Sequence, residues 1–283
     1  MKDNKKRGIL HIVCAAFCFA LMSFFVRLSG DVPSFQKAFF RNIVALVVAT
    51  VLLLRSEEKF RMQKGSFPYL FMRSLCGGIG LLCNFYAIDR LNISDANMLN
   101  KLSPFFAVIF SVFILKEKAK LNEWLAVIAA FVGALFVMKP TFNMDFIPAL
   151  IGAMGGLGAG VAYTFVRLLG KHGERGPLIV FFFSAFSTLM TLPVILFDYH
   201  PMAGWQWACL IAAGVAAMGG QLNITAAYTY APAKEISVFD YSQILFAAAL
   251  GFLFLDQAPD WMSVLGYVII IGAAVYRWTQ RER

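Results

Sequence analysis

The stretch FVRLSG at residues 25–30 returns 140 residues later as FVRLLG at residues 165–170. The same spacing, with no gap, aligns Phe106-Ala107 with Phe246-Ala247 and Leu115 with Leu255. Chance identities are common in apolar sequence, so the hexapeptide alone would be a weak signal. Three separate segments that keep one offset indicate an internal duplication of the chain.

Apolar side chains dominate the sequence on both sides of these segments. Hydrophobic residues make up 60% of the 283 residues and charged residues only 14%. A soluble domain has roughly 45–50% apolar and about 25% charged residues, so a water-soluble enzyme or nucleic-acid-binding protein is excluded. A helix needs about 20 mostly apolar residues to cross a bilayer. Ten stretches meet or approach this length: 9–28, 36–54, 68–88, 93–115, 121–138, 146–169, 177–197, 205–228, 233–255 and 260–278. Because these runs are continuous and twice the length of a barrel strand, they predict an all-α integral membrane protein with ten transmembrane helices.

Lys and Arg residues are distributed unevenly between the ends of the predicted spans. With the N-terminus in the cytoplasm, 18 of the 25 Lys and Arg residues fall in cytoplasmic segments, four outside and three within spans. This excess on one side follows the positive-inside rule. It predicts a multi-pass protein of the inner (cytoplasmic) membrane with both termini in the cytoplasm.

Each copy of the duplication holds five predicted spans, in residues 1–140 and in residues 141–283. Because five is an odd number, the second copy must enter the membrane upside down relative to the first. Inverted repeats are the architecture of secondary transporters, whose solute site lies near the middle of the bilayer where the halves meet. The pattern therefore favours a carrier, while a duplication that merely built a stable helix bundle is the alternative.

Three sets of residues give the chain a likeness to a known family. They are Ala38-Phe39-Phe40-Arg41, the block from Ala87 through Ser103-Pro104 to Leu115-Lys116-Glu117-Lys118, and Gly133-Ala134 with its echo Gly272-Ala273. On these residues the chain resembles the EamA-type members of the drug/metabolite transporter superfamily, over nearly its whole length. The resemblance implies ten helices, a central cavity lined by spans one, three, four, six, eight and nine, and movement of small organic solutes. The second half departs from the family where Leu255-Asp256-Gln257 replaces the usual Glu after the fourth span.

Ionisable and polar side chains gather near the middle of the predicted fourth and ninth spans. Lys101 and Asp240 are costly inside a membrane unless they are paired or face a cavity. They could form an internal ion pair, or they could be exposed in turn to a charged solute or a proton. The other candidate solute-binding residues are Asn84, Asn97, Asn100, Tyr163, Gln221, Asn223, Tyr241 and Gln243. A single Asn often joins two helices, but the concentration of polar groups in a few spans favours a water-filled cavity.

Two arginines and one proline complete the candidate site. Arg41 and Arg73 lie within spans two and three, where they could extend to the interface or face the cavity. If they face inward, cations outnumber Asp240, and this balance favours solutes with an anionic or zwitterionic group. Lys101 is the residue that we expect to meet that anionic group. Pro104 frees a backbone carbonyl one turn earlier and is a candidate gate hinge.

Several features that other functions require are missing from the sequence. The first span carries no acid, so exchange of protons for cationic drugs at such a carboxylate is not supported. No phosphate-binding loop occurs. The three histidines are scattered, and Cys14 and Cys18 share a helix face without a third ligand, so we expect neither a metal nor a cofactor.

These observations lead to a transporter rather than an enzyme. We expect a carrier that moves amino acids, organic acids or nucleoside-like metabolites across the lipid bilayer by alternating access. Asp240 is the only midplane carboxylate and is therefore the expected proton-coupling residue, with solute exchange as the other mode. We expect no nucleic-acid partner, and a monomer or a homodimer. A passive channel and, further away, an intramembrane enzyme are the alternatives.

Overall fold

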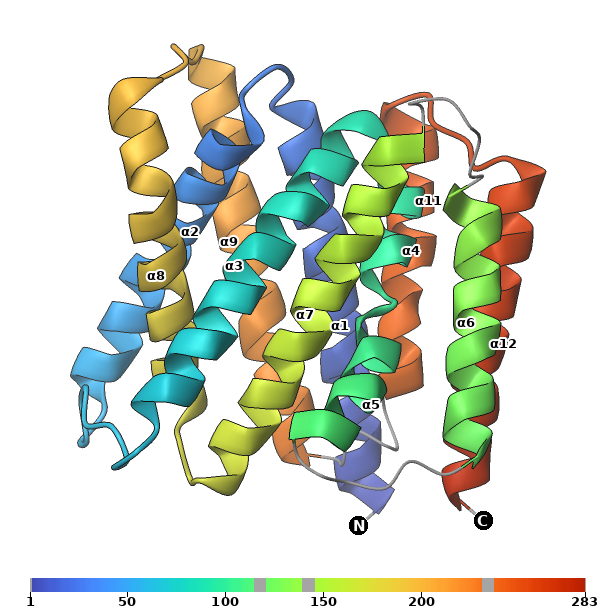
Figure 1. Ribbon diagram of the computed structural model, residues 1–283. Helices are drawn as coiled ribbons and strands as arrows, with labels where there is room; N and C mark the ends of the chain where they lie inside the picture. Colours follow the sequence, from blue (N-terminus) through green and yellow to red (C-terminus); the bar gives the residue numbers. More distant parts are fainter. Residues whose placement is uncertain (1, 115–120, 139–145, 231–236, 283) are drawn as a thin grey trace.

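The computed structural model describes residues 2–114, 121–138, 146–230 and 237–282 (Figure 1). All regular structure in these ranges is helical. The elements are α1 (Lys2–Leu28), α2 (Ser34–Arg55), α3 (Phe67–Arg90), α4 (Ile93–Asn100), α5 (Ser103–Ile114), α6 (Leu121–Met138), α7 (Ile147–Lys171), α8 (Gly176–Phe197), α9 (Gly204–Tyr230), the 3-10 helix η2 (Ser237–Tyr241), α11 (Ser242–Phe254) and α12 (Trp261–Glu282). The family-like residues 115–118, the predicted boundary between residues 140 and 141, and the predicted start of the ninth span at residue 233 lie outside the described residues.

The prediction of an all-α membrane protein is confirmed. Seven helical stretches are long and apolar enough to cross a bilayer, and three shorter apolar helices lie at residues 124–137, 239–254 and 261–276. Each of these ten segments coincides with one of the ten predicted spans. Proline in the first turn starts α3, α7 and α8, a position where the missing N–H is not needed and the fixed φ favours the helix.

The stretch predicted as a continuous fourth span is broken in the structure. The helix α4 ends at Asn100 and α5 begins at Ser103, so Lys101 and Leu102 lie in the break. Pro104 is the second residue of α5 and cannot donate a hydrogen bond back to the carbonyl of Asn100, which explains a stop here. Hydropathy could not reveal this break, because it reports apolar continuity and not backbone geometry. Whether Pro104 acts as a hinge stays a prediction.

The ninth span is irregular at the corresponding place. The 3-10 helix η2 contains Asp240 and Tyr241, and regular α-helix starts only at Ser242. A shift of 140 residues places Tyr241 on Lys101. The Tyr241 hydroxyl donates to the carbonyl oxygen of Lys101 at 3.1 Å, so the two irregular segments contact each other. Non-helical backbone at membrane depth requires this kind of partner within the protein.

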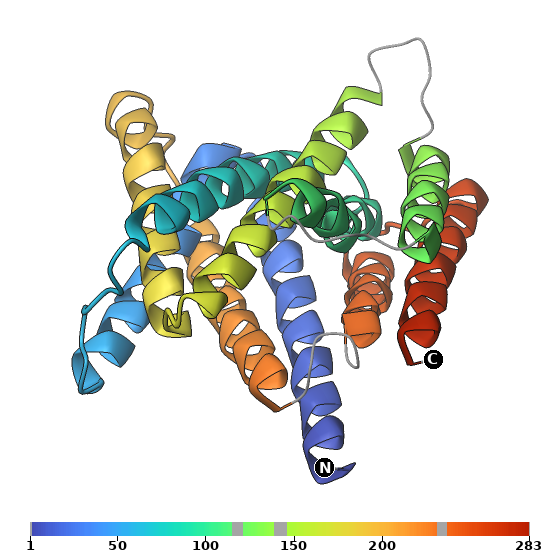
Figure 2. The ribbon, with the colours of Figure 1, turned by 60° about the horizontal axis from the view of Figure 1, so that its bottom comes forward.

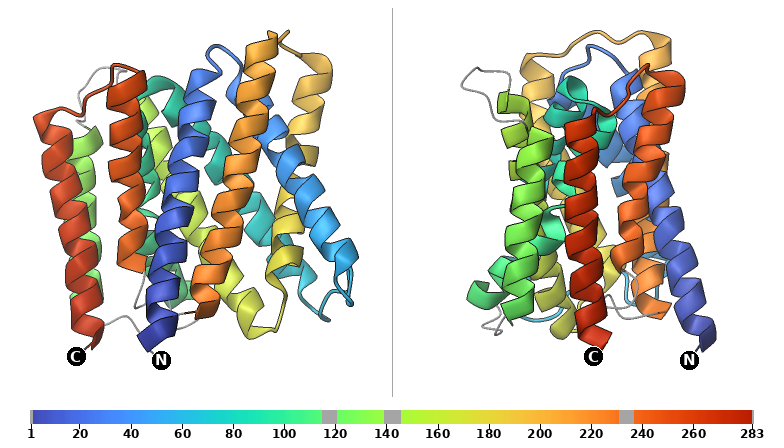
Figure 3. Two further views of the ribbon diagram at one scale, coloured as in Figure 1. Left: turned by 180° about the vertical axis from the view of Figure 1, so that it is seen from behind. Right: turned by 90° about the vertical axis from the view of Figure 1, so that its right-hand side faces the viewer.

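The helices pack in pairs that each join the first half of the chain to the second. The most extensive contacts are α3 with α7, α1 with α9, α6 with α12 and α2 with α8, and α4 also contacts α11. The first helices of the two halves, α1 and α7, run in opposite directions (Figure 1). The start of α1 and the end of α12 lie at the same end of the bundle, as seen from two further sides (Figures 2 and 3).

Glycines bring the backbones of α3 and α7 together. A Cβ added at Gly158 would lie 2.8 Å from the Cys76 carbonyl oxygen and 2.9 Å from Gly80 Cα. A Cβ at Gly80 would lie 3.0 Å from the backbone of Gly155 and of Ala159. Small residues allow such close packing where lipid supplies no hydrophobic driving force between helices. This contact fixes α3 and α7 as one wall of the cavity described next.

Candidate functional site

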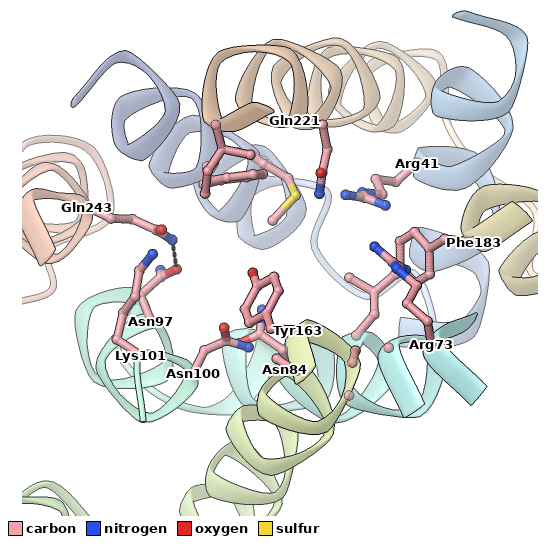
Figure 4. Close-up of a pocket in the computed structure, with 18 residues that line it drawn as sticks. Arg41, Arg73, Asn84, Asn97, Asn100, Lys101, Tyr163, Phe183, Gln221 and Gln243 are labelled. Carbon is pink, nitrogen blue, oxygen red and sulfur yellow. Dashed lines mark hydrogen bonds between the residues drawn. The ribbon is translucent and has the colours of Figure 1, made fainter. Parts of the chain in front are cut away.

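A cavity of about 110 Å³ lies between the two halves, and it has room for several water molecules or a small solute. Helices of both halves border it, so it is completed only when the halves pack (Figure 4). Among the predicted solute-binding residues, those that border the cavity are Asn84, Asn97, Asn100, Lys101, Tyr163, Gln221 and Gln243. Spans one, three, four, six, eight and nine all contribute, as the family resemblance implies. Spans two and seven contribute as well, through Arg41 and Phe183.

One end of the cavity carries an ion pair between the halves. The ammonium of Lys101 lies 2.5 Å from a carboxylate oxygen of Asp240. Lys101 is 8% exposed, and its position at the C-cap of α4 follows from the helix break. Asp240 is not among the residues that border the cavity. Of the two alternatives that the sequence left open for Lys101 and Asp240, the internal ion pair is therefore the one present, and it neutralises this end.

An amide network lies beside the ion pair. Asn97 accepts hydrogen bonds from Gln243 Nε2 at 2.5 Å and from Ser23 Oγ at 3.0 Å, and donates to the carbonyl of Ile93 at 2.6 Å. These bonds connect α4 to α11 and to α1. Ser23 was not predicted as a site residue, because a lone serine in a first span gives no sequence signal. With its hydrogen bonds satisfied, Asn97 is held in a fixed orientation at the cavity wall.

The other end of the cavity carries two buried arginines. Arg41 is 3% exposed and Arg73 is 7% exposed, so neither extends to the membrane interface and both border the cavity. Their guanidinium carbons lie 5.9 Å and 3.9 Å, respectively, from the centre of the Phe183 ring. Cation–π contacts of this kind stabilise a charge that has left water. Phe183 could not be singled out in advance, because the chain holds 29 phenylalanines.

Between the two ends, polar side chains face the open space. Asn84 and Tyr163 lie between Lys101 and Arg73, with Gln221 on the opposite side (Figure 4). Tyr163 keeps 48% of its surface accessible. The side-chain oxygen of Asn84 is buried and has no hydrogen-bond partner. These groups offer donors and acceptors to a molecule that occupies the cavity.

Two further predicted residues lie outside the cavity wall. Asn223 is hydrogen-bonded to Nδ1 of His11 on α1 at 2.8 Å and donates to the carbonyl of Gly219 at 2.9 Å. Tyr241 is 5% exposed and uses its hydroxyl on the Lys101 carbonyl. Neither is among the residues that border the cavity, so a direct contact with solute stays a prediction for both.

A second charged cluster closes one end of the bundle, where α1, α2 and α3 meet. Lys37, whose side chain is fully buried, forms an ion pair with Asp89 and also donates to the Gly30 carbonyl at 2.8 Å. Ser34 Oγ donates to the second oxygen of Asp89 at 2.8 Å, and Arg27 donates to the Ile88 carbonyl at 2.9 Å. The cluster ties three helix ends together away from the cavity.

Comparisons with known proteins agree with this architecture. The model of the EamA-like transporter family matches residues 6–139 and again residues 149–277. The pseudopaline exporter CntI of Pseudomonas aeruginosa is 30% identical over 276 residues, which cover 96% of each chain. The riboflavin transporter of Vibrio cholerae is 25% identical and covers 100% of this chain and 98% of its own. The S-adenosylmethionine uptake transporter of Rickettsia prowazekii is 23% identical over 86% of this chain and 82% of its own.

A solved crystal structure shares the fold. It superposes with a TM-score of 0.68 at 17% sequence identity, and the match covers 95% of each chain. At this identity the likeness concerns the arrangement of the helices alone.

Proposed function

Since the chain belongs to the EamA-like transporter family and is a membrane transporter of small molecules, not an enzyme, we propose that it is a secondary transporter. Its proposed solutes are small organic metabolites with an anionic or zwitterionic group: amino acids, organic acids or nucleoside-like compounds. Its proposed mechanism is alternating access, with proton coupling or solute exchange. The relatives named for pseudopaline, riboflavin and S-adenosylmethionine support a metabolite as the cargo.

One observation carries this proposal: the cavity is lined by polar side chains from both halves, and the fourth and ninth spans depart from regular α-helix beside it. The fourth span breaks at Lys101 and the ninth is irregular at Asp240. Broken helices around a midplane site are typical of secondary transporters, where they place polar groups and freed backbone atoms against the solute. A continuous ion pore would instead call for a ring of like groups along its length.

The packing of the halves supports an inverted duplication with units at residues 1–140 and 141–283. The contact of α3 with α7 becomes the contact of α9 with α1 when the halves are exchanged, and the other main pairs map onto themselves. The opposite directions of α1 and α7 (Figure 1) are the relation that an upside-down second copy requires. Two such packings of nearly equal energy would open the cavity to one side and then to the other.

Asp240 is the proposed proton-coupling residue. It lies against Lys101, and one of its carboxylate oxygens is buried without a hydrogen-bond partner. Protonation of Asp240 would release Lys101 and change the charge of the cavity by one unit. The proposed orientation is in the inner membrane with both termini in the cytoplasm, which the positive-inside count supports. A monomer holds the complete cavity, and a homodimer is compatible with it.

The test is counterflow in liposomes that contain the purified protein. A carrier loaded with unlabelled solute accumulates labelled solute transiently and saturably, and the pH dependence of this accumulation is lost in Asp240→Asn. Arg90→Gln, at an exposed position on α3 away from the cavity, is the control that keeps both properties. A linear, unsaturable flux would identify a passive channel instead. A fully active Asp240→Asn variant with an unchanged pH profile would overturn proton coupling through this residue.

A further inference from the structure

We propose that Arg41 and Arg73 form an anion subsite of the cavity, and that the transported solutes carry two negative charges on oxyanion groups. This inference rests on the transport function proposed above. It places the anionic part of the solute at the α2–α3–α8 end of the cavity and not at Lys101. The chemistry is that of a dicarboxylate or a phosphate monoester, both of which present oxygens that a guanidinium binds.

The first support is the charge balance of the cavity wall. The charged residues that border the cavity are Arg41, Arg73 and Lys101. Lys101 is neutralised by Asp240, whereas no carboxylate forms an ion pair with either arginine among the described residues. Two positive charges are therefore left in a membrane interior, where an uncompensated charge is costly. A solute with two negative charges restores neutrality, and one with a single charge leaves half of the imbalance.

The second support is the distance between the two arginines. Both guanidinium groups lie against the same ring, Phe183, at 3.9 Å and 5.9 Å from its centre. Their guanidinium carbons are thus less than 10 Å apart by these two distances. Figure 4 shows both side chains reaching the cavity from different helices. Like charges held this close repel each other, and an anion between or beside them removes the repulsion.

The third support is the set of unused donors. Within the part of the chain that the structure describes, Nε of Arg41 and both Nε and Nη1 of Arg73 are buried without a hydrogen-bond partner. Arg41 donates through Nη1 to the side-chain oxygen of Asn42 at 2.6 Å. Buried polar groups are nearly always hydrogen-bonded. The two arginines therefore bring buried, unused N–H donors to this end of the cavity, as an anion site requires.

The rest of the wall gives the solute its second contact region. Asn84, Tyr163 and Gln221 lie between the arginines and the neutral Lys101–Asp240 pair (Figure 4). These side chains bind hydroxyl, amide or ammonium groups through hydrogen bonds without adding charge. The expected solute is thus short, with its oxyanion groups at the arginines and uncharged polar atoms toward the amides.

The experiment compares matched pairs of dianion and neutral isostere on the purified protein. The pairs are succinate with succinamide, and glycerol 3-phosphate with glycerol, measured by thermal shift at constant ionic strength. The anion of at least one pair is expected to raise the melting temperature, and its neutral partner is not. Arg73→Gln and Arg41→Gln are expected to weaken binding of that anion at least tenfold. Arg73→Lys, which keeps the charge and loses the planar fork, is expected to lie between.

Arg90→Gln is the matched control. Arg90 lies on α3 as Arg73 does, but it is exposed and contacts the Tyr86 ring at 3.8 Å, away from the cavity. Its loss is expected to leave anion binding unchanged. In the absence of ligand, the melting temperature of Arg73→Gln is expected to be no lower than that of the wild type, because the substitution removes an unpaired buried charge. A purely structural arginine would give the opposite result, a lower melting temperature and unaltered binding by the variant that remains folded.

Three outcomes separate this inference from the function on which it rests. If the dianions and their neutral partners shift wild-type melting equally or not at all, the subsite is overturned. The subsite is also overturned if a neutral or cationic solute shows saturable counterflow in wild type and the same counterflow in Arg73→Gln. In that case the proposed transport function is supported and the anion subsite is not. If no solute of any charge shows counterflow, the proposed transport function itself fails.

Discussion

Removing the charge of Asp240 tests whether the ion pair between the halves stabilises the fold, moves protons, or does both. Asp240→Asn keeps the shape of the side chain and leaves the ammonium of Lys101, which is 8% exposed, without its counterion. Breaking a buried pair by removing one partner costs about 3–5 kcal/mol. The lower end applies here, because the Asp240 side chain keeps 15% of its surface accessible and one of its oxygens already lacks a partner.

The expected loss of about 3 kcal/mol corresponds to a melting temperature lowered by roughly 6 °C, at about 2 °C per kcal/mol for a chain of this size. The double variant Lys101→Met with Asp240→Leu removes both charges. Because an apolar pair of similar volume replaces a buried ion pair at little cost, its stability is expected to return to within about 1 kcal/mol of wild type. The melting temperatures of wild type, Lys101→Met, Asp240→Leu and the double variant, in one detergent, complete the cycle.

Counterflow by the same four proteins in liposomes separates stability from function. If the pair takes part in transport, the double variant is as stable as wild type and yet inactive. Two results would refute the reasoning. One is a single variant with the melting temperature of wild type, which would mean that the charge of Lys101 does not need Asp240 as its counterion. The other is a double variant no more stable than the single variants. A stable double variant with full, pH-dependent counterflow would remove both residues from the mechanism.

Two further predictions concern the packing of the bundle. Gly158→Ala places a methyl group 2.8 Å from a backbone oxygen of α3 and is expected to destabilise the protein by about 1–3 kcal/mol. Gly170→Ala is the control on the same helix: its methyl group meets no atom within 4 Å, so this variant is expected to be neutral or stabilising. Melting temperatures of the two variants decide this, and equal values would contradict the close approach of the backbones. Lys37→Met leaves Asp89 without its buried cation and is expected to cost at least about 2 kcal/mol of stability. Glu58→Gln breaks the ion pair of Glu58 with Arg175 at a side chain that is 60% exposed, and it is expected to cost less than about 1 kcal/mol. An equal loss in these two variants would show that burial does not govern the ion pairs of this protein.

The membrane fold follows from local properties of the chain. The free energy of an apolar stretch in lipid depends on its own length and composition, and those are properties that hydropathy measures. The repeat at residues 25–30 and 165–170 predicts how the halves are related, because an odd number of spans per copy would turn the second copy upside down. The same reasoning placed seven of the predicted solute-binding residues at one cavity, since spacing along a helix determines which side chains share a face.

Other features of the site depend on contacts between segments far apart in the chain. Whether Arg41 and Arg73 reach the interface or the cavity depends on the rotation of α2 and α3 against α8, which no local pattern encodes. The roles of Phe183 and Ser23 arise in the same way, from what lies opposite them. The break at Lys101 is an intermediate case. Pro104 predicts a disturbed helix, but the sequence does not predict that the Tyr241 hydroxyl donates to the carbonyl oxygen of Lys101.

The sequence by itself determined that this chain is an all-α membrane protein with ten apolar segments, because the cost of burying each segment in lipid is set by that segment alone. Only the tertiary structure decided which charges cancel and which are left over. Asp240 lies within bonding distance of Lys101 and not of either arginine, and electrostatic energy depends on the distance between charges, which is fixed only when the helices pack.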